Sequence, residues 1–133
     1  MVADRGNSRL VVFDHAGAVQ QVITDDLLRL PSCLAVDGDD LILTDLGGDL
    51  LALDRDARAR SLVDATPSSQ RVAPWPNQIL DGRPARPDLH DGTLHSPHSV
   101  AVAGDGTIFL TEWLIGGRQV RLQPQRVRRP SRR

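Results

Sequence analysis

Two matching stretches decide the fold: PSCLAVDGDDLILTD (residues 31–45) and PHSVAVAGDGTIFLTE (residues 97–112). Each begins with a proline and two small or polar residues, then has an apolar run, a Gly/Asp turn and a second apolar run, and ends on threonine and an acid. Short apolar runs rich in Val, Leu and Ile, bounded by Gly and Asp, predict strands joined by tight turns. Each stretch therefore predicts a β-hairpin.

The pattern continues beyond each acid. A glycine-containing turn and a third apolar run follow in LGGDLLALD (46–54) and in WLIGGRQVRLQ (113–123). The opening VADRGNSRLVVFD (2–14) matches the second half of the same unit. An outer strand is predicted within residues 18–23 and again within 59–65. The complete unit is therefore a four-stranded antiparallel meander.

The recurring acids Asp4, Asp45 and Glu112 give the period of the repeat, which is 41 residues between the first two (45 − 4). Meanders of four strands that recur about every 40 residues are typical of β-propeller blades. A β-sandwich can use strands at this spacing but does not need three copies of one pattern. We predict an all-β fold over residues 1–123: a partial β-propeller of about three four-stranded antiparallel blades, the first and last incomplete.

An insertion separates the second and third copies, at about residues 66–96. It contains five of the nine prolines of the chain. A proline-rich loop of this length inside a compact fold is either functional or flexible. Trp75 lies between two of these prolines, so we expect its ring to pin the loop to one face of the propeller, or to stack on a ligand.

Composition excludes several classes of protein. The 133 residues are 40% hydrophobic and 25% charged, which is typical of one soluble domain. No apolar stretch approaches the roughly 18 residues that cross a bilayer, so we expect no membrane association. Cys33 is the only cysteine, which excludes an internal disulfide. No secretory signal follows Met1, which predicts a cytoplasmic protein if that start is authentic.

Charge is distributed unevenly along the chain. Residues 118–133 contain seven arginines and no acid, whereas all 17 acids precede them. Clustered arginines can bind phosphates, but this segment has no aromatic residue on which a base could stack. We therefore predict no nucleic-acid partner, and interpret residues 124–133 as a basic disordered tail.

The stretches ADRGNSRLVVFDHAG (3–17) and SPHSVAVAGDGTIFLTEW (96–113) resemble the repeat of the NHL family, over roughly residues 2–65 and 94–122. The resemblance implies a six-bladed propeller, of which this chain would be half. An open arc exposes strand edges that soluble proteins normally cover. We expect either a fragment of a larger propeller protein or self-association through the open blade edges.

The resemblance extends to the lyases that complete peptide amidation, which hold zinc in the central channel with histidines. SPHSVAV (96–102) matches one of their Pro-His-Ser motifs at His98, and Ser32 is the equivalent residue of the middle copy. His90 and His95 lie close enough in sequence to join His98 as ligands of zinc or another divalent metal. Alternatively, His98 is structural, and one of its ring nitrogens hydrogen-bonds to the backbone of the adjoining blade.

Two functions remain open. The first is a binding scaffold that holds a protein or small-molecule ligand at the blade-mouth face, with His98, Ser99, Ser32 and Trp75 as contact residues. The second is a metal-dependent lyase or hydrolase related to peptidyl-amidoglycolate lyase, with His98 as a channel metal ligand. No catalytic residue is assigned. We expect the recurring acids to be structural and to accept hydrogen bonds that fix the turns, with Arg9 paired to one of them.

Overall fold

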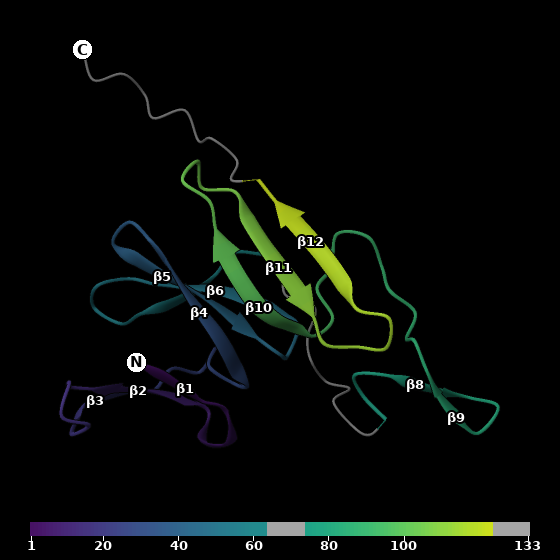
Figure 1. Cartoon of the computed structure of the whole chain (residues 1–133), viewed down its shortest axis with the longest axis horizontal. Helices are drawn as coiled ribbons and strands as arrows, with labels where there is room; N and C mark the ends of the chain where they lie inside the picture. Colours follow the sequence, from purple (N-terminus) through teal and green to yellow (C-terminus); the bar gives the residue numbers. More distant parts are fainter. Residues whose placement is uncertain (64–73, 124–133) are drawn as a thin grey trace, which may run out of the picture.

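The computed structural model describes residues 1–63 and 74–123, which form an all-β, partial propeller-like fold (Figure 1). The predicted tail (124–133) and the first part of the insertion lie outside these residues. The strands are β1 Val2–Asp4, β2 Arg9–Phe13, β3 Val19–Ile23, β4 Pro31–Asp37, β5 Asp40–Asp45, β6 Asp49–Leu53, β7 Ala59–Ser61, β8 Gln78–Leu80, β9 Arg83–Ala85, β10 Pro97–Val102, β11 Ile108–Glu112 and β12 Arg118–Leu122.

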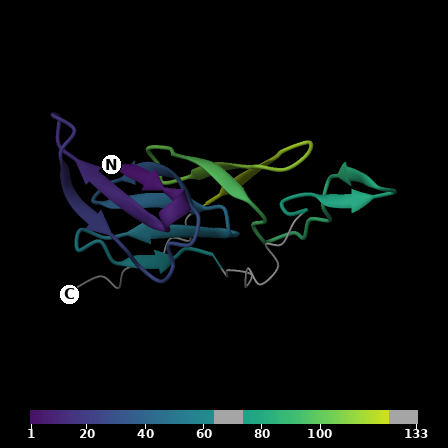
Figure 2. The same ribbon diagram turned by 90° about the horizontal axis from the view of Figure 1, so that it is seen from below.

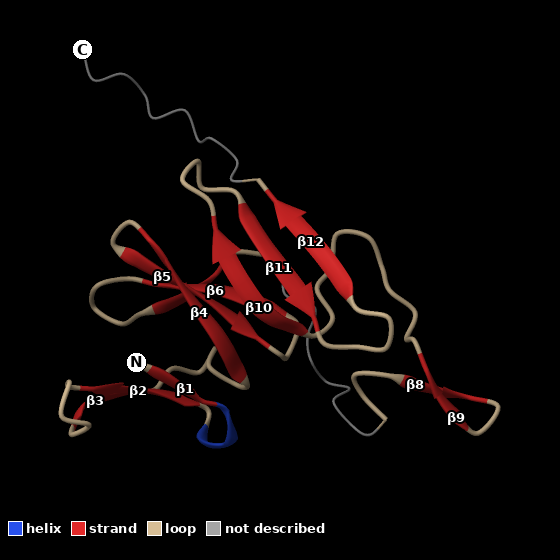
Figure 3. Cartoon of the chain, in the orientation of Figure 1, coloured by secondary structure: helices blue, strands red, loops and turns tan. Residues whose placement is uncertain are grey.

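Ten of these strands form three antiparallel sheets, which we call blades 1, 2 and 3. Their strand orders are β1-β2-β3, β4-β5-β6-β7 and β10-β11-β12, so blade 2 has four strands and the others have three. This is the predicted arrangement. Blade 1 begins at the second strand of the repeat, and blade 3 extends to its third within the described residues. Figure 3 shows that strands dominate and that the short 3-10 turn Arg5–Asn7 follows β1.

Blade 2 lies between the other two, and both of its faces are buried. Successive side chains of a strand point to opposite faces of the sheet, so each strand contributes to two separate cores. One face packs on blade 1 and the other on blade 3. The first core contains Leu10, Ile23, Leu28, Leu43, Leu51 and Leu53. The second contains Ile42, Leu50, Ala52, Leu94, Ile108 and Leu110. Each fully buried leucine contributes about 1.5–3 kcal/mol through burial of its apolar surface.

The insertion is not an irregular loop throughout, as the sequence analysis assumed. Strands β8 and β9 form a hairpin that extends away from the three blades (Figure 2). Its turn is Asp81-Gly82, and both residues have positive φ, 49° and 72°. An Asp-Gly pair is the strongest short-range hairpin signal because both residues tolerate this conformation. No helix among the described residues is long and apolar enough to cross a membrane.

Candidate functional site

The recurring acids hold the segment that enters each inner strand. The carboxylate of Asp45 accepts hydrogen bonds from the backbone N–H groups of Arg29 and Leu30, at 2.9 and 2.7 Å. The carboxylate of Glu112 accepts from the equivalent N–H groups of His95 and Ser96, and pairs with Arg118. The structural role predicted for these acids is therefore confirmed. Each acid fixes the two residues that come just before Pro31 or Pro97.

A β-bulge follows each of these prolines. Pro31 pairs with Asp45 and Cys33 with Thr44, so Ser32 is an extra residue in β4. The register of β10 shifts in the same way between Pro97 and Ser99, which makes His98 the extra residue there. A bulged residue is left out of the strand ladder and its side chain is re-aimed, and bulges are common beside binding sites. The same irregularity thus presents Ser32 and His98 at the mouths of blades 2 and 3.

These two residues meet, and a third blade contributes to the same cluster. The Ser32 hydroxyl donates a hydrogen bond to the backbone carbonyl of His98 at 2.9 Å. Arg5, in the turn after β1, donates from Nη2 to the Ser32 hydroxyl at 3.0 Å and lies 3.5 Å from Nε2 of His98. Trp113 of blade 3 places its ring 6.4 Å from the His98 ring, centroid to centroid. We call Arg5, Ser32, His98 and Trp113 the mouth cluster.

Arg5 is the charged group of the mouth cluster. Its carboxylate neighbour in sequence, Asp4, is engaged by Asn7 and Arg9, and the hydrogen bond from Arg9 is the main cause that lowers the pKa of Asp4. Arg5 forms no ion pair within residues 1–63 and 74–123, and its buried Nε has no hydrogen-bond partner there. A guanidinium has five N–H donors and binds carboxylates in a bidentate manner. Arg5 therefore retains donors for an acceptor-bearing ligand.

The ring and the backbone of His98 contact different blades. Nε2 of the ring lies 3.5 Å from Nη2 of Arg5, which is long for a hydrogen bond. The backbone carbonyl of His98 also accepts from the Thr44 hydroxyl at 3.2 Å, which fixes its main chain from blade 2. The ring of His98 thus lies beside the Arg5 side chain, whereas the structural alternative predicted a hydrogen bond from the ring to the backbone of the adjoining blade. It is the His98 backbone that blade 2 holds.

Arg5 and Trp113 were missed in the sequence analysis, although the repeat contained a signal for both. Each directly follows a recurring acid: Arg5 follows Asp4, and Trp113 follows Glu112. The same position in blade 2 is Leu46, which is buried. Since Ser32 and His98 also share one repeat position, all four residues of the mouth cluster come from only two positions of the repeat. Comparing the residues after each acid would have identified them.

The remaining predicted site residues lie elsewhere. Nε2 of His95 is 2.8 Å from the carbonyl oxygen of Pro76, and its ring lies 6.3 Å from that of Trp75. Trp75 is half-buried, and it anchors the insertion against the segment that enters β10. His90 is exposed, and its carbonyl accepts from Thr93. Ser99 is exposed on the outer face of blade 3 and does not join the mouth cluster.

The predicted histidines do not form a metal site together. In the described part of the chain, no three His, Cys, Asp or Glu side chains are grouped so that they could hold one metal ion. A catalytic zinc needs three protein ligands. The three-histidine set of His90, His95 and His98 is therefore not assembled in this structure, and the arrangement does not support a zinc or other divalent metal there.

Comparison with known proteins adds no assignment. No family model matches the sequence, and no curated protein matches it.

Proposed function

We propose that the chain is a segment of an NHL-type β-propeller that acts as a binding scaffold, with the mouth cluster as its contact surface. The observation that carries the proposal is Arg5, which is half-buried where the three blades meet and has no ion pair among the described residues. Retaining a partly desolvated guanidinium without a carboxylate costs free energy. A ligand that supplies an acceptor recovers that cost, because charge-assisted hydrogen bonds are about twice as strong as neutral ones.

Trp113 adds an apolar surface to this site. Its side chain is 55% exposed at the mouth, beside the ring of His98. An exposed aromatic ring close to a cation provides stacking area for a flat group of a ligand. The proposed ligand, whether a protein segment or a small molecule, therefore combines an anionic or strongly accepting group with an adjacent flat or apolar group.

Benzoate and benzamide test this proposal because they share size and shape but differ in charge. Replacing Trp75 with phenylalanine leaves Trp113 as the single tryptophan, since the chain has two. Its fluorescence then reports on the mouth alone. We expect benzoate to bind to the W75F chain more tightly than benzamide does.

Arg5→Gln in the same W75F background should weaken benzoate binding about tenfold, because a charge-assisted hydrogen bond contributes about 1.5–3 kcal/mol. Arg58→Gln is the matched control, because Arg58 is an exposed arginine outside the mouth cluster. Equal binding of benzoate and benzamide, or an Arg5→Gln variant that binds benzoate as tightly as the parent, would contradict the proposal.

The enzymatic alternative is separated from this one by metal content. A lyase or hydrolase with His98 as a metal ligand requires zinc or another divalent ion bound stoichiometrically, and His98→Ala should abolish that binding. Equilibrium dialysis against zinc, followed by elemental analysis of both chains, measures this directly. Zinc that binds equally to the parent chain and to His98→Ala excludes His98 as a ligand.

A further inference from the structure

Blade 1 has one open face, and that face is apolar. In blade 2, we call the face that packs on blade 1 the trailing face and the face that packs on blade 3 the leading face. The equivalent faces of blades 1 and 3 take the same names. Aligning the three blades on the recurring acids and on the strand register shows which residues of this face are equivalent. In blade 1 they are Val2, Val11 and Phe13. In blade 2 they are Leu43, Leu51 and Leu53, and in blade 3 they are Leu110, Val120 and Leu122. In blades 2 and 3 this face packs against the preceding blade.

In blade 1 the same face is exposed. Val2 and Val11 lie in one cross-strand row with Val22, and Phe13 pairs with Val19. Four of these five side chains are 40–56% exposed, the exception being Val11 at 6%. A contiguous apolar patch of this kind marks an interaction surface.

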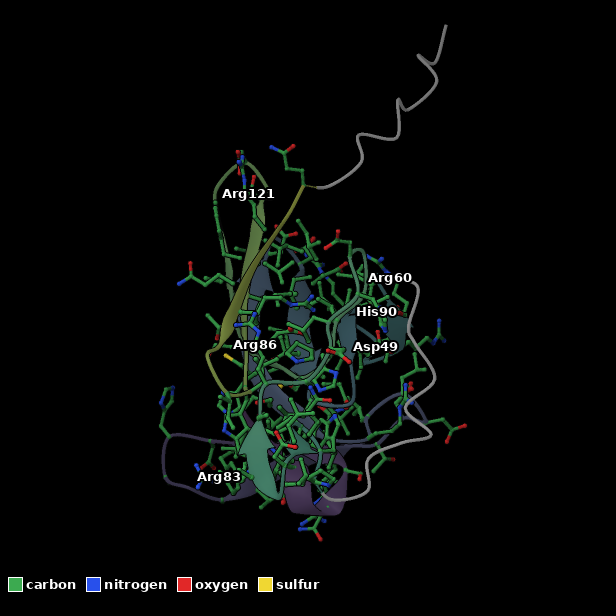
Figure 4. The ribbon with its side chains drawn as sticks, turned by 90° about the vertical axis from the view of Figure 1, so that its right-hand side faces the viewer. Asp49, Arg60, Arg83, Arg86, His90 and Arg121 are labelled. Atoms are coloured by element: carbon green, nitrogen blue, oxygen red, sulfur yellow. The ribbon has the colours of Figure 1, made fainter. Side chains whose placement is uncertain are left out.

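The second open face belongs to blade 3, and it mixes apolar with polar side chains. Its leading face carries the rows Ala101–Phe109–Arg121 and Ser99–Thr111–Gln119. The same residues line a hollow of about 540 Å³. Phe109, 47% exposed, takes the position of Ile42, which is buried against blade 3 in the contact between blades 2 and 3. Arg121, labelled in Figure 4, lies on the outer strand β12, where its aliphatic stem can cover apolar surface while its charge stays in water.

We propose that two copies of this chain pair head to tail, the trailing face of blade 1 in each copy packing on the leading face of blade 3 in the other. Within the chain, every covered trailing face is covered by the leading face of another blade, and the described residues leave one of each open. Propellers typically close with four to eight blades. The described residues of one copy supply three blades, those of two copies supply 3 + 3 = 6 and those of three copies supply nine, so two copies give a number of blades that closes a ring.

This pairing does not depend on binding at the mouth cluster, but it completes that surface. Among the described residues, blade 1 consists of β1, β2 and β3, and none of these is the innermost strand of the repeat that would lie beside the turn of Arg5. In the ring, blade 1 adjoins blade 3 of the second copy, and two sets of Arg5, Ser32 and His98 surround one opening. A contact between unlike faces closes into a symmetric dimer rather than a filament when the ring is complete.

Light scattering after size exclusion tests the pairing on the full chain. We expect a mass of about 29 kDa, twice the 14.5 kDa of one chain. Val22→Glu on the trailing face and Phe109→Glu on the leading face should each weaken the dimer at least tenfold. Val36→Glu is the matched control, because Val36 is a 70% exposed valine on blade 2 and lies on neither open face.

Mixing the two variants identifies the orientation. A mixed pair retains one intact contact, between the leading face of the Val22→Glu chain and the trailing face of the Phe109→Glu chain. An equimolar mixture should therefore contain more dimer than either variant forms alone at the same total concentration. A parent chain that stays at 14.5 kDa at the highest concentration, or a mixture that remains monomeric, would overturn the proposal.

Disulfide cross-linking provides a second measurement that needs no disruptive charge. Val2 and Phe109 take the positions of Leu110 and Ile42, which share a core. In a Cys33→Ser background, a mixture of Val2→Cys and Phe109→Cys chains should form a cross-linked dimer under mild oxidation. Cross-linking of Val2→Cys chains to one another at the same rate would also overturn the head-to-tail arrangement.

Discussion

In blade 2 the acid that ends the second strand is paired across the turn with another acid, whereas in blade 3 it is paired with an arginine. Asp45 is opposite Asp49, and Glu112 is opposite Arg118. Blade 1 follows the pattern of blade 3, with Asp4 opposite Arg9. Blade 2 obtains its cation from outside the turn: Nη2 of Arg29 lies 3.5 Å from the carboxylate of Asp49.

This difference shows what the repeat preserves. The acid always accepts hydrogen bonds, and in blades 2 and 3 two of them come from the backbone that leads into the inner strand. The arginine that balances the acid varies in its position: it lies across the turn in blades 1 and 3 and outside the turn in blade 2. Blade 2 also buries its two acids to 0% and 1% exposure, and Asp49 needs a further donor, the hydroxyl of Ser61 at 2.6 Å. We therefore expect the acid turn of blade 2 to tolerate less change than that of blade 3, and that of blade 1 to tolerate most.

The largest effect is expected for Asp45→Ala. The substitution leaves three backbone N–H groups without their acceptor, those of Arg29, Leu30 and Gly47, in a buried turn. We expect the free energy of unfolding to fall by about 3 kcal/mol or more, since each unsatisfied buried donor costs about 1–3 kcal/mol. Urea denaturation at fixed protein concentration measures it. Asp54→Ala is the matched control, because the Asp54 carboxylate also accepts hydrogen bonds from backbone N–H groups but is exposed. An equal loss of stability in Asp54→Ala would show that burial does not cause the effect of Asp45→Ala.

An intermediate effect is expected for Glu112→Gln in blade 3. The neutral amide keeps an acceptor for the backbone of His95 and Ser96 but leaves Arg118 without its carboxylate. We expect a loss of about 1–3 kcal/mol in the free energy of unfolding. Adding Arg118→Gln should return part of this loss, because the unpaired cation is removed. If the double variant is less stable than the sum of the single losses, the ion pair is not the main interaction.

A smaller effect is expected for the pairing of Arg29 with Asp49. The carboxylate is buried but the arginine side chain is 35% exposed, so solvent screens the interaction. A double-mutant cycle with Arg29→Gln and Asp49→Asn should give a coupling free energy of about 0.5–1 kcal/mol. The single Asp49→Asn variant also changes the contact with Ser61, and the cycle separates that contribution. Coupling near zero would show that Arg29 does not serve as the counter-charge of Asp49.

The smallest effect is expected at Asp4 in blade 1. Hydrogen bonds from Arg9 and then from Asn7 lower the pKa of this partly exposed carboxyl, so its contribution to stability is present above the ordinary pKa of an aspartate and is lost as pH falls through the lowered value. Asp4→Asn should therefore lower the unfolding midpoint slightly at neutral pH, and the difference from the parent chain should disappear as pH falls below the lowered pKa of Asp4. A carbon-13 NMR titration checks the cause: Arg9→Gln should move the pKa of Asp4 back up toward its ordinary value.

Much of the fold was readable from the sequence because the repeat is local. The apolar runs, their Gly/Asp turns and the period gave the all-β class and ten strands in three sheets, with the outer strand of blade 2 ending at Ser61, earlier than predicted. The hairpin in the insertion was not predicted, although Asp81-Gly82 is a hairpin signal. The surrounding prolines favour irregular structure, and the whole insertion was therefore expected to be a loop.

The candidate site was readable only in part. His98 and Ser32 were found as members of one repeat position, and the bulge that places them follows the proline in both blades. Arg5 and the spatial meeting of three blades were not found. Arg5 and His98 are 93 positions apart in the sequence. Whether they touch depends on the angle at which successive blades pack, and the sequence pattern does not specify that angle. Pattern identifies positions, and packing decides which of them become neighbours.

The bulges after Pro31 and Pro97 also bear on how this surface could diversify. A residue outside the strand ladder has no cross-strand partner in register, so exchanging its side chain leaves the pairing of its neighbours intact. Serine occupies one such place here and histidine the other. Selection for new binding specificity can therefore change these two side chains with little loss in the free energy of unfolding, which makes the mouth the most evolvable part of the molecule.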